Sequence, residues 1–302
     1  MSFVANRGAI TVEERTDVAG GAISLPENAP GDASVIAQAA TENFPVASRI
    51  LPRAQRDHVR AIYGFARLVD DAGDESPGNR LALLAWLDAE IDRLFAGEVP
   101  AHPLVRGLAP TVRPCALEPG PFHRLIEANR RDQHQARYET FAELLDYCQL
   151  SAAPVGELVL GVFGKATPER IDLSDRICAG LQVTEHLQDV AEDHARDRVY
   201  LPRQDMERFG CGDADLAATK PSPAFRELMA FEVRRARDLL AAGAPLVRTL
   251  PARPRLAVAA FVAGGRAALT ALDRAGYDVL GHAPRPSRAA FATELVHTVV
   301  AG

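Results

Sequence analysis

The sequence predicts an all-α fold in one large domain, and three features of the chain indicate it. First, apolar residues recur three or four positions apart, as at Leu84, Leu87, Ile91 and Leu94, which places them on one face of a helix. Second, no run of residues alternates convincingly between apolar and polar side chains, so strands are not indicated. Third, breakers such as residues 76–79 (Ser-Pro-Gly-Asn) divide the chain into segments of helical length.

The order of these segments defines the predicted domain organisation. Residues 1–38 are expected to form a flexible N-terminal tail, because glycine, alanine, proline and acidic residues are scattered there without a sustained period. The all-helical domain then spans residues 39–302. The proline-rich stretch 100–121 predicts only a short helix, and a helix over 140–164 should be interrupted near Pro154. The other predicted helices cover residues 52–75, 80–97, 122–138, 172–196, 222–250, 254–277 and 287–302.

Composition restricts the classes of function. The 302 residues are 47% hydrophobic and carry a net charge of −6, so the chain lacks the basic face that nucleic acid requires. No signal peptide is evident, and the apolar run 256–265 is too short to span a bilayer. A peripheral membrane contact is compatible with this pattern. The cysteines lack the spacing of a disulfide framework or zinc site, so a reducing, cytoplasmic setting is expected. They are Cys115, Cys148, Cys178 and Cys211.

The first candidate site is an acidic pair near the end of the helix predicted over 52–75. Asp70 and Asp74 are four residues apart and therefore share a helix face. The neighbouring stripe, which includes Val59, Ile62 and Val69, is apolar and should face the core. The acidic face is therefore expected to border the interior of the protein.

A second acidic pair has the same spacing in the helix predicted over 172–196. Asp189 and Asp193 lie four residues apart, and their stripe extends backwards through Glu185 and Gln182. Two arginines, Arg196 and Arg198, follow at the end of that helix, where their charge also suits the helix dipole.

Both pairs suggest a hard cation. Like charges four residues apart destabilise a helix by about 0.2–0.5 kcal/mol per pair. Mg²⁺ offsets such repulsion and usually binds one or two carboxylates together with substrate phosphates. Two facing acidic helices could thus hold a diphosphate through bridging Mg²⁺, with Arg67, Arg196 and Arg198 completing the neutralisation. A solvated acidic surface is the alternative for either pair taken alone.

Other nucleotide and metal motifs fit less well. The segment 161–165 resembles a phosphate loop but is followed by Ala166 instead of Ser or Thr, and no dinucleotide fingerprint is evident. A di-iron bundle would need a Glu three residues before a histidine. Val183 and Ala191 stand at that spacing before His186 and His194, so this alternative is disfavoured.

Taken together, several motifs resemble the squalene and phytoene synthases, which join prenyl diphosphates head to head. The resemblance runs from about residue 42 to about residue 277. Within this family, three features look most like the hydroxysqualene synthases of bacteria: residues 44–49, residues 151–156 and Glu185-His186. The motifs that carry the family resemblance are residues 43–49, 63–67 with the first acidic pair, 138–141, 147–148, 182–193 and 198–202.

This resemblance implies an isoprenoid synthase-type helical bundle with a central cavity. The expected reaction is Mg²⁺-dependent ionisation of presqualene diphosphate, rearrangement, and water capture to give hydroxysqualene in squalene and hopanoid biosynthesis. Tyr63, Tyr147, Asp70 and Asp189 would be catalytic. The implied metal ligands are Asp70, Asp74, Glu185, Asp189 and Asp193, and the implied substrate-binding residues are Arg49, Arg67, Gln182, Arg196, Arg198 and Arg266.

Two alternatives accompany this interpretation. A presqualene diphosphate, squalene or phytoene synthase would condense two prenyl diphosphates with the same acidic motifs. A non-catalytic helical scaffold for pathway enzymes belongs to another class, and four intact aspartates argue against it. The apolar product also suggests handover to other enzymes of the pathway.

Overall fold

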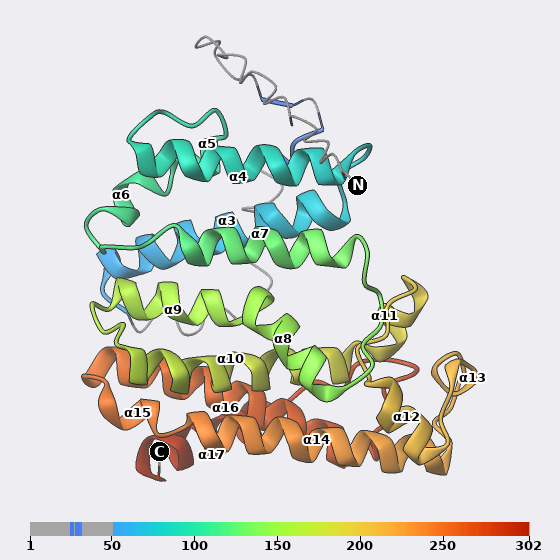
Figure 1. Cartoon of the computed structure of the whole chain (residues 1–302). Coiled ribbons are helices and arrows are strands. Elements are labelled where there is room, and N and C mark those ends of the chain that lie inside the picture. Colours follow the sequence, from blue (N-terminus) through green and yellow to red (C-terminus); the bar gives the residue numbers. More distant parts are fainter. Residues whose placement is uncertain (1–24, 27, 32–50, 302) are drawn as a thin grey trace, which may run out of the picture.

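The computed structural model describes residues 25–26, 28–31 and 51–301 of the chain. In this part the structure is helical and contains no strand, which confirms the predicted all-α class. Figure 1 shows the longer helices stacked in layers, from α4 through α7 and α9 to α10 and α14. The helices are α3 (Arg53–Asp74), α4 (Arg80–Ala96), α5 (Pro103–Arg106), α6 (Ala109–Val112), α7 (Gly120–Asp132), α8 (Phe141–Ser151), α9 (Ala153–Val162), α10 (Pro168–Gln188), α11 (Val190–Ala195), α12 (Arg203–Phe209), α13 (Asp213–Leu216), α14 (Pro223–Gly243), α15 (Leu246–Thr249), α16 (Ala252–Arg274) and α17 (Arg288–Ala301).

Several predicted helix boundaries were wrong. The helix expected over 222–250 is divided into α14 and α15, with Pro245 between them, because proline cannot continue the hydrogen-bond ladder. The interruption expected near Pro154 occurs at Ala152, and Pro154 lies in the first turn of α9, where proline is tolerated. Helices α12 and α13 were not predicted.

Helix α7 ends at Asp132, earlier than the predicted 138. After a turn at residues 133–134, the chain is extended and pairs with the segment after α11. The amide of Val199 donates to the carbonyl of Ala136 at 2.8 Å, and the amide of Arg203 donates to that of Tyr138 at 2.9 Å. This pairing takes residues 136–138 out of the helix and brings two distant segments together.

Helix α3 is fixed by its apolar face. Val59, Ile62 and Val69 are buried, as their spacing predicted. Phe65, on the same helix, packs edge-on against Phe122 of α7 with ring centroids 5.3 Å apart. The two helices are therefore held together, with the end of α3 beside the end of α7.

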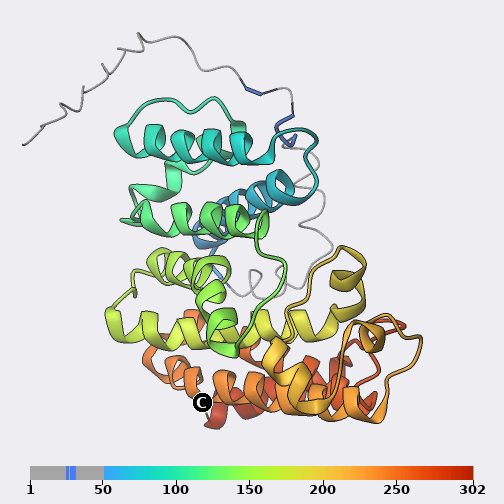
Figure 2. The same ribbon diagram turned by 45° about the vertical axis from the view of Figure 1, so that its right-hand side comes forward.

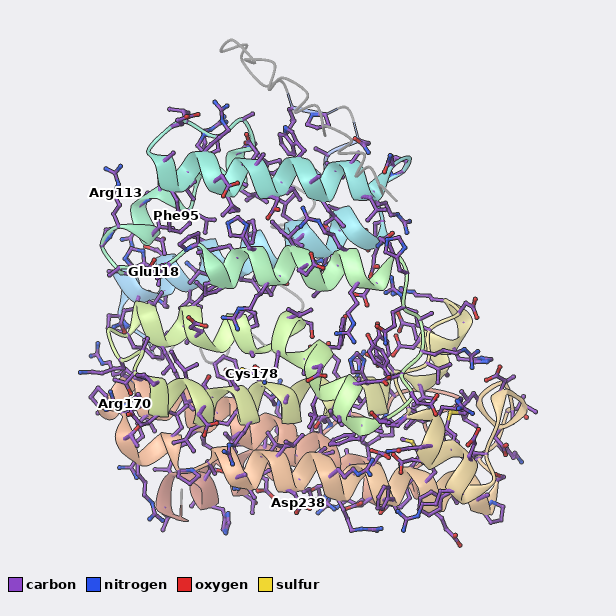
Figure 3. All side chains as sticks on the ribbon, viewed as in Figure 1. Phe95, Arg113, Glu118, Arg170, Cys178 and Asp238 are labelled. Atoms are coloured by element: carbon purple, nitrogen blue, oxygen red, sulfur yellow. The ribbon has the colours of Figure 1, made fainter. Side chains whose placement is uncertain are left out.

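Small residues permit close packing around α10. A Cβ on Gly156 of α9 would lie 2.3 Å from Ser174 Oγ and 2.6 Å from Cys178 Sγ, and Figure 3 labels Cys178 on α10. On its other side α10 packs along α14, where a Cβ on Gly243 would lie 2.7 Å from the carbonyl oxygen of Leu173. The turned view in Figure 2 shows α10 between the upper helices and the α14 layer.

Helix α16 is long and apolar enough to cross a membrane by length and composition, and it is the one such helix in the described part of the chain. In the fold, 61% of its most apolar window is buried. A helix in the core of a protein can have the same length and composition. Helix α16 packs against α10, α14, α15 and α17.

Part of the predicted tail contacts the domain. The side-chain amide of Asn28 donates to the carbonyl of Pro77 at 2.9 Å, and His102 lies 3.1 Å from the carbonyl of Pro30. Within the predicted tail, residues 1–38, the structure describes only residues 25–26 and 28–31. The prediction for the other residues lies outside the described part of the chain.

Because Gly243 touches the backbone of α10, Gly243→Ala should push α14 away. We expect a loss of about 1–3 kcal/mol in the free energy of unfolding, measured by urea denaturation. Gly264→Ala is the matched control, since nothing lies within 4 Å of a Cβ at that helical position. Its unfolding free energy should stay equal or rise. Equal losses in both variants would contradict the packing account.

Candidate active site

Asp70 and Asp74 lie in the last turns of α3. The side-chain amide of Asn129, on α7, donates to Asp70 Oδ1 at 3.1 Å. Desolvation by the surrounding protein raises the pKa of Asp70 to about 7, while Asn129 and Arg67 oppose the rise. The Asp70 residue is nevertheless exposed. Its carboxylate is therefore crowded by protein atoms on one side and open to a ligand on the other.

Helix α7 supports this turn of α3 at two points. Gln133 donates from its side-chain amide to the carbonyl of Gly73 at 3.0 Å. A Cβ on Gly73 would lie 2.2 Å from Asn129 Oδ1, so the glycine lets Asn129 approach the acidic turn. Asn129 therefore contacts the Asp70 carboxyl directly, whereas Gln133 contacts only the backbone of the neighbouring turn.

The second acidic motif departs from its predicted form. Helix α10 ends at Gln188, Asp189 has φ −103° and ψ 15°, and α11 begins at Val190. The continuous helix expected over 172–196 was therefore wrong. The break places Glu192 and Asp193 in the first turn of a new helix, where negative charge suits the helix dipole instead of opposing it.

The carboxylates of this motif repel one another. Desolvation, followed by the charges of Asp193 and Glu192, raises the pKa of Asp189 to about 6, and Arg196 partly opposes this. Glu185, on α10, is exposed. Clustered, partly desolvated carboxylates that carry negative charge at neutral pH attract a cation.

One ion pair directly joins the two motifs. Arg198, just after α11, contacts both carboxylate oxygens of Asp74 at 2.5 and 3.1 Å. Hydrogen bonding to Asp74 raises the pKa of the Arg198 guanidinium. This forked contact brings the end of α3 beside the second motif, as the diphosphate hypothesis required.

The other predicted substrate-binding residues lie in different settings. Arg67 pairs with Asp71 at 2.8 Å and with Glu75, and exposed Arg196 pairs with Glu192 at 3.0 Å. Arg266 donates to Thr298 Oγ1 of α17 at 3.1 Å, and the Gln182 amide lies 3.2 Å from His186 Nε2. Arg49 lies outside the described residues. Their roles toward substrate stay predictions.

Four rings form a compact cluster next to the second motif: Tyr138, Tyr147, His186 and Tyr200. His186 stacks on Tyr200 with ring centroids 3.7 Å apart. Tyr147 packs against Tyr138 at 5.5 Å and against Tyr200 at 5.8 Å. We call these residues the aromatic cluster. Tyr63 is half-buried on α3, seven positions before Asp70.

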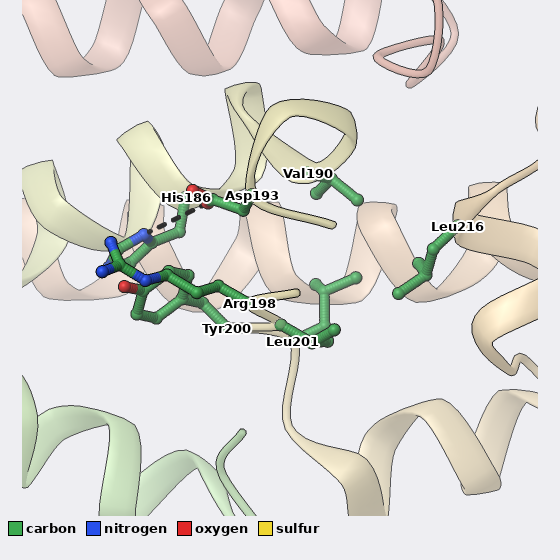
Figure 4. Close-up of a pocket in the computed structure, with 8 residues that line it drawn as sticks. His186, Val190, Asp193, Arg198, Tyr200, Leu201 and Leu216 are labelled. Carbon is green, nitrogen blue, oxygen red and sulfur yellow. Dashed lines mark ion pairs between the residues drawn. The ribbon is translucent and has the colours of Figure 1, made fainter. Parts of the chain in front are cut away.

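His186 links the aromatic cluster to the acidic motif. Its Nδ1 lies 3.8 Å from Asp193 Oδ2. Figure 4 shows this pair beside Arg198 and Tyr200 in a small pocket closed by Val190, Leu201 and Leu216. Burial lowers the pKa of His186, although Asp193 partly opposes the change.

The donor set fits Mg²⁺ that binds together with a phosphate. Within the described part of the chain, no three His, Cys, Asp or Glu side chains gather closely enough to hold a metal by themselves. The five predicted ligands therefore do not form one protein-only cage. Asp70, Asp74, Asp189 and Asp193 offer hard oxygen donors in two groups, which suits an ion that also takes ligands from a diphosphate.

Sequence reasoning missed several residues of the site. Asn129 and Asp132 end a helix whose boundary was misplaced, so their proximity to α3 was hidden. Tyr138 and Tyr200 were noted as motif residues without a role. The spacing of Asn129 and Gln133, four apart with both amides facing α3, was the available signal.

Comparison with known protein families gives a direct assignment. The model of the squalene/phytoene synthase family matches residues 37–290. The chain is 39% identical over 211 residues to the hydroxysqualene synthase of Rhodopseudomonas palustris, covering 68% of this chain and 70% of the relative. It is 32% identical over 256 residues to the phytoene synthase of Arthrospira platensis, covering 79% and 82%.

Solved structures agree with this assignment. The structure of squalene synthase HpnC from Alicyclobacillus acidocaldarius matches with a TM-score of 0.76 and 43% identity, over 84% of this chain and 97% of that chain. A dehydrosqualene synthase in complex with a ligand matches with a TM-score of 0.81 over 89% and 95%. At 23% identity the second likeness shows the fold alone. The predicted isoprenoid synthase-type fold is confirmed.

Asn129→Ala should weaken Mg²⁺ use at neutral pH and below. Loss of its hydrogen bond raises the pKa of Asp70 further, so protons compete better with the metal. We expect the Mg²⁺ concentration for half-maximal activity to rise about 10-fold near pH 7 and to recover as pH increases. Gln133→Ala, which removes an amide that contacts Gly73 but not Asp70, is the control. An unchanged metal requirement in Asn129→Ala, or an equal change in the control, would contradict this role.

Proposed function

The chain belongs to the squalene/phytoene synthase family, and we propose that it converts presqualene diphosphate and water into hydroxysqualene and diphosphate. Its relatives in this family are enzymes that act on prenyl diphosphates. Two hydroxysqualene synthases, from Rhodopseudomonas palustris and Sinorhizobium fredii, are 39% and 37% identical to it. The Glu185-His186 pair in the second motif supports the same subgroup.

The observation that carries the proposal is the Asp74–Arg198 ion pair. It brings a guanidinium and the acidic end of α3 together beside the second acidic motif. Mg²⁺, when bound, would stabilise charge on the departing diphosphate as a Lewis acid. Arg198 would contribute a forked cation that suits phosphate oxygens, and Asp70, Asp74, Asp189 and Asp193 would supply the oxygen ligands.

The aromatic cluster supports the cationic part of the reaction. Ionisation of presqualene diphosphate leaves a cyclopropylcarbinyl cation, and aromatic faces stabilise cations. Tyr147 and Tyr200 are buried and lie beside the second motif. Their phenols stay protonated because burial raises the pKa of both, so they present neutral rings to a reactive intermediate.

A condensing synthase is the second candidate, favoured by the match to the Arthrospira platensis phytoene synthase. It would join two prenyl diphosphates at the same acidic motifs. The non-catalytic scaffold finds no support, since the relatives are enzymes. A cytoplasmic location, and handover of the apolar product to a further pathway enzyme or to a membrane, are parts of the proposal.

The purified protein should form hydroxysqualene from presqualene diphosphate with Mg²⁺ and without nicotinamide, identified by mass spectrometry of the extracted lipid. Asp70→Asn and Asp193→Asn should each reduce the rate by at least about 100-fold, because each removes a metal ligand.

A parallel incubation with farnesyl or geranylgeranyl diphosphate provides the opposing test. Condensation there, with no turnover of presqualene diphosphate, would overturn the proposal and favour the condensing alternative. Full activity in both aspartate variants would contradict the assigned site.

A further inference from the structure

We propose that Asp132 is a positioning residue that accepts, through Tyr147, the proton released when water captures the carbocation. This inference rests on the proposed function and adds a residue to it. It follows from one partly buried hydrogen bond and from the charges around it.

The hydrogen bond joins two helices at the base of the aromatic cluster. The Tyr147 hydroxyl, on α8, donates to Asp132 Oδ2 at 2.7 Å. Asp132 is the last residue of α7, and Tyr147 is only 5% exposed. A carboxylate in this position holds the phenol in one orientation and can receive its proton.

Two further polar atoms nearby indicate a site for a water molecule or a proton. Within the described structure, Asp132 Oδ1 and Tyr138 Oη are buried and lack a hydrogen-bond partner. Buried polar atoms are rarely left unpaired. The Asp132 carboxyl therefore has an oxygen available for a proton or for a water molecule.

The charges that act on Asp132 come from its own helix, from α3 and from the segment after α11. Arg131 of α7 and Arg198 favour its ionised form, while Asp74 of α3 disfavours it. Tyr138, Tyr147 and Tyr200 supply neutral phenols around it. Desolvation is the largest effect and raises the pKa of Asp132 to about 6, which suits a group that must be ionised before capture and protonated after it.

The proposed step balances in atoms and charge. A lone pair of water forms the new carbon–oxygen bond to the cation, giving an oxonium. The oxonium releases a proton to the Tyr147 oxygen while the Tyr147 proton moves to Asp132 Oδ2. The products are a neutral alcohol, a neutral tyrosine and a neutral carboxylic acid, and Asp132 returns its proton to solvent before the next turnover.

The test is the ratio of hydroxysqualene to all other lipid products formed from presqualene diphosphate at saturating Mg²⁺. This ratio reports on capture and is insensitive to Asp70 and Asp189, which act earlier, at ionisation. In the wild type the alcohol fraction should fall as pH drops below about 6. In Asp132→Asn, which keeps the hydrogen-bond acceptor, the rate of alcohol formation should fall about 100-fold, with KM unchanged and no dependence of the alcohol fraction on pH in this range.

Two more variants separate this role from a structural one. Tyr147→Phe keeps the ring but removes the hydroxyl, and it should lose the same pH dependence. Asp175→Asn is the control, because Asp175 is another desolvated carboxyl with its pKa raised to about 6, on α10. It should keep the wild-type ratio and pH dependence. Melting temperatures of all variants establish that they are folded.

The outcomes are distinguishable. A wild type that makes no alcohol refutes the proposed function, and the inference falls with it. A wild type that makes the alcohol, with an unchanged ratio and pH dependence in Asp132→Asn, overturns the inference alone. The same is true if Asp175→Asn behaves like Asp132→Asn.

Discussion

The site depends on keeping several carboxylates ionised where the protein disfavours their charge. Desolvation raises the pKa values of Asp70 and Asp189, and the surrounding structure opposes this in specific ways. Asn129 and Arg67 favour the ionised form of Asp70, and Arg196 favours that of Asp189. The break at Asp189 puts the acidic residues of α11 at a helix N-terminus. These contacts keep carboxylates ionised, so that a metal ion can bind them together with a diphosphate.

The aromatic cluster lies directly beside the charged residues of the second acidic motif. Arg198 and His186 belong to the second motif region, yet His186 stacks on Tyr200, which packs against Tyr147. In the proposed reaction, diphosphate departure and cation chemistry would therefore involve neighbouring groups of residues. The extended pairing of residues 136–139 with 199–204 fixes this arrangement, because it carries Tyr138 and Tyr200 to the same place.

The sequence predicted the features that depend on neighbouring residues in the chain, and it did not predict those that depend on distant contacts. Helix α3, its buried stripe and its acidic end followed from periodicity, since burial of Val59, Ile62 and Val69 needs only one helix face. The end of α7 and the break at Asp189 did not. The end of α7 depends on pairing with a segment far away in the chain, which period and propensity do not encode. Asn129 and Asp132 were missed because their contacts join distant segments, whereas Arg198 followed from the second acidic motif itself and the family resemblance gave Tyr147 its role.

A crystal structure of the protein with Mg²⁺ and inorganic diphosphate would test the central claim most directly. We expect diphosphate to lie between the Asp70/Asp74 and Asp189/Asp193 pairs, with metal ions bridging both pairs to its oxygens and Arg198 contacting phosphate. Diphosphate bound away from these pairs, or metal ions that contact only one of them, would contradict the two-motif site.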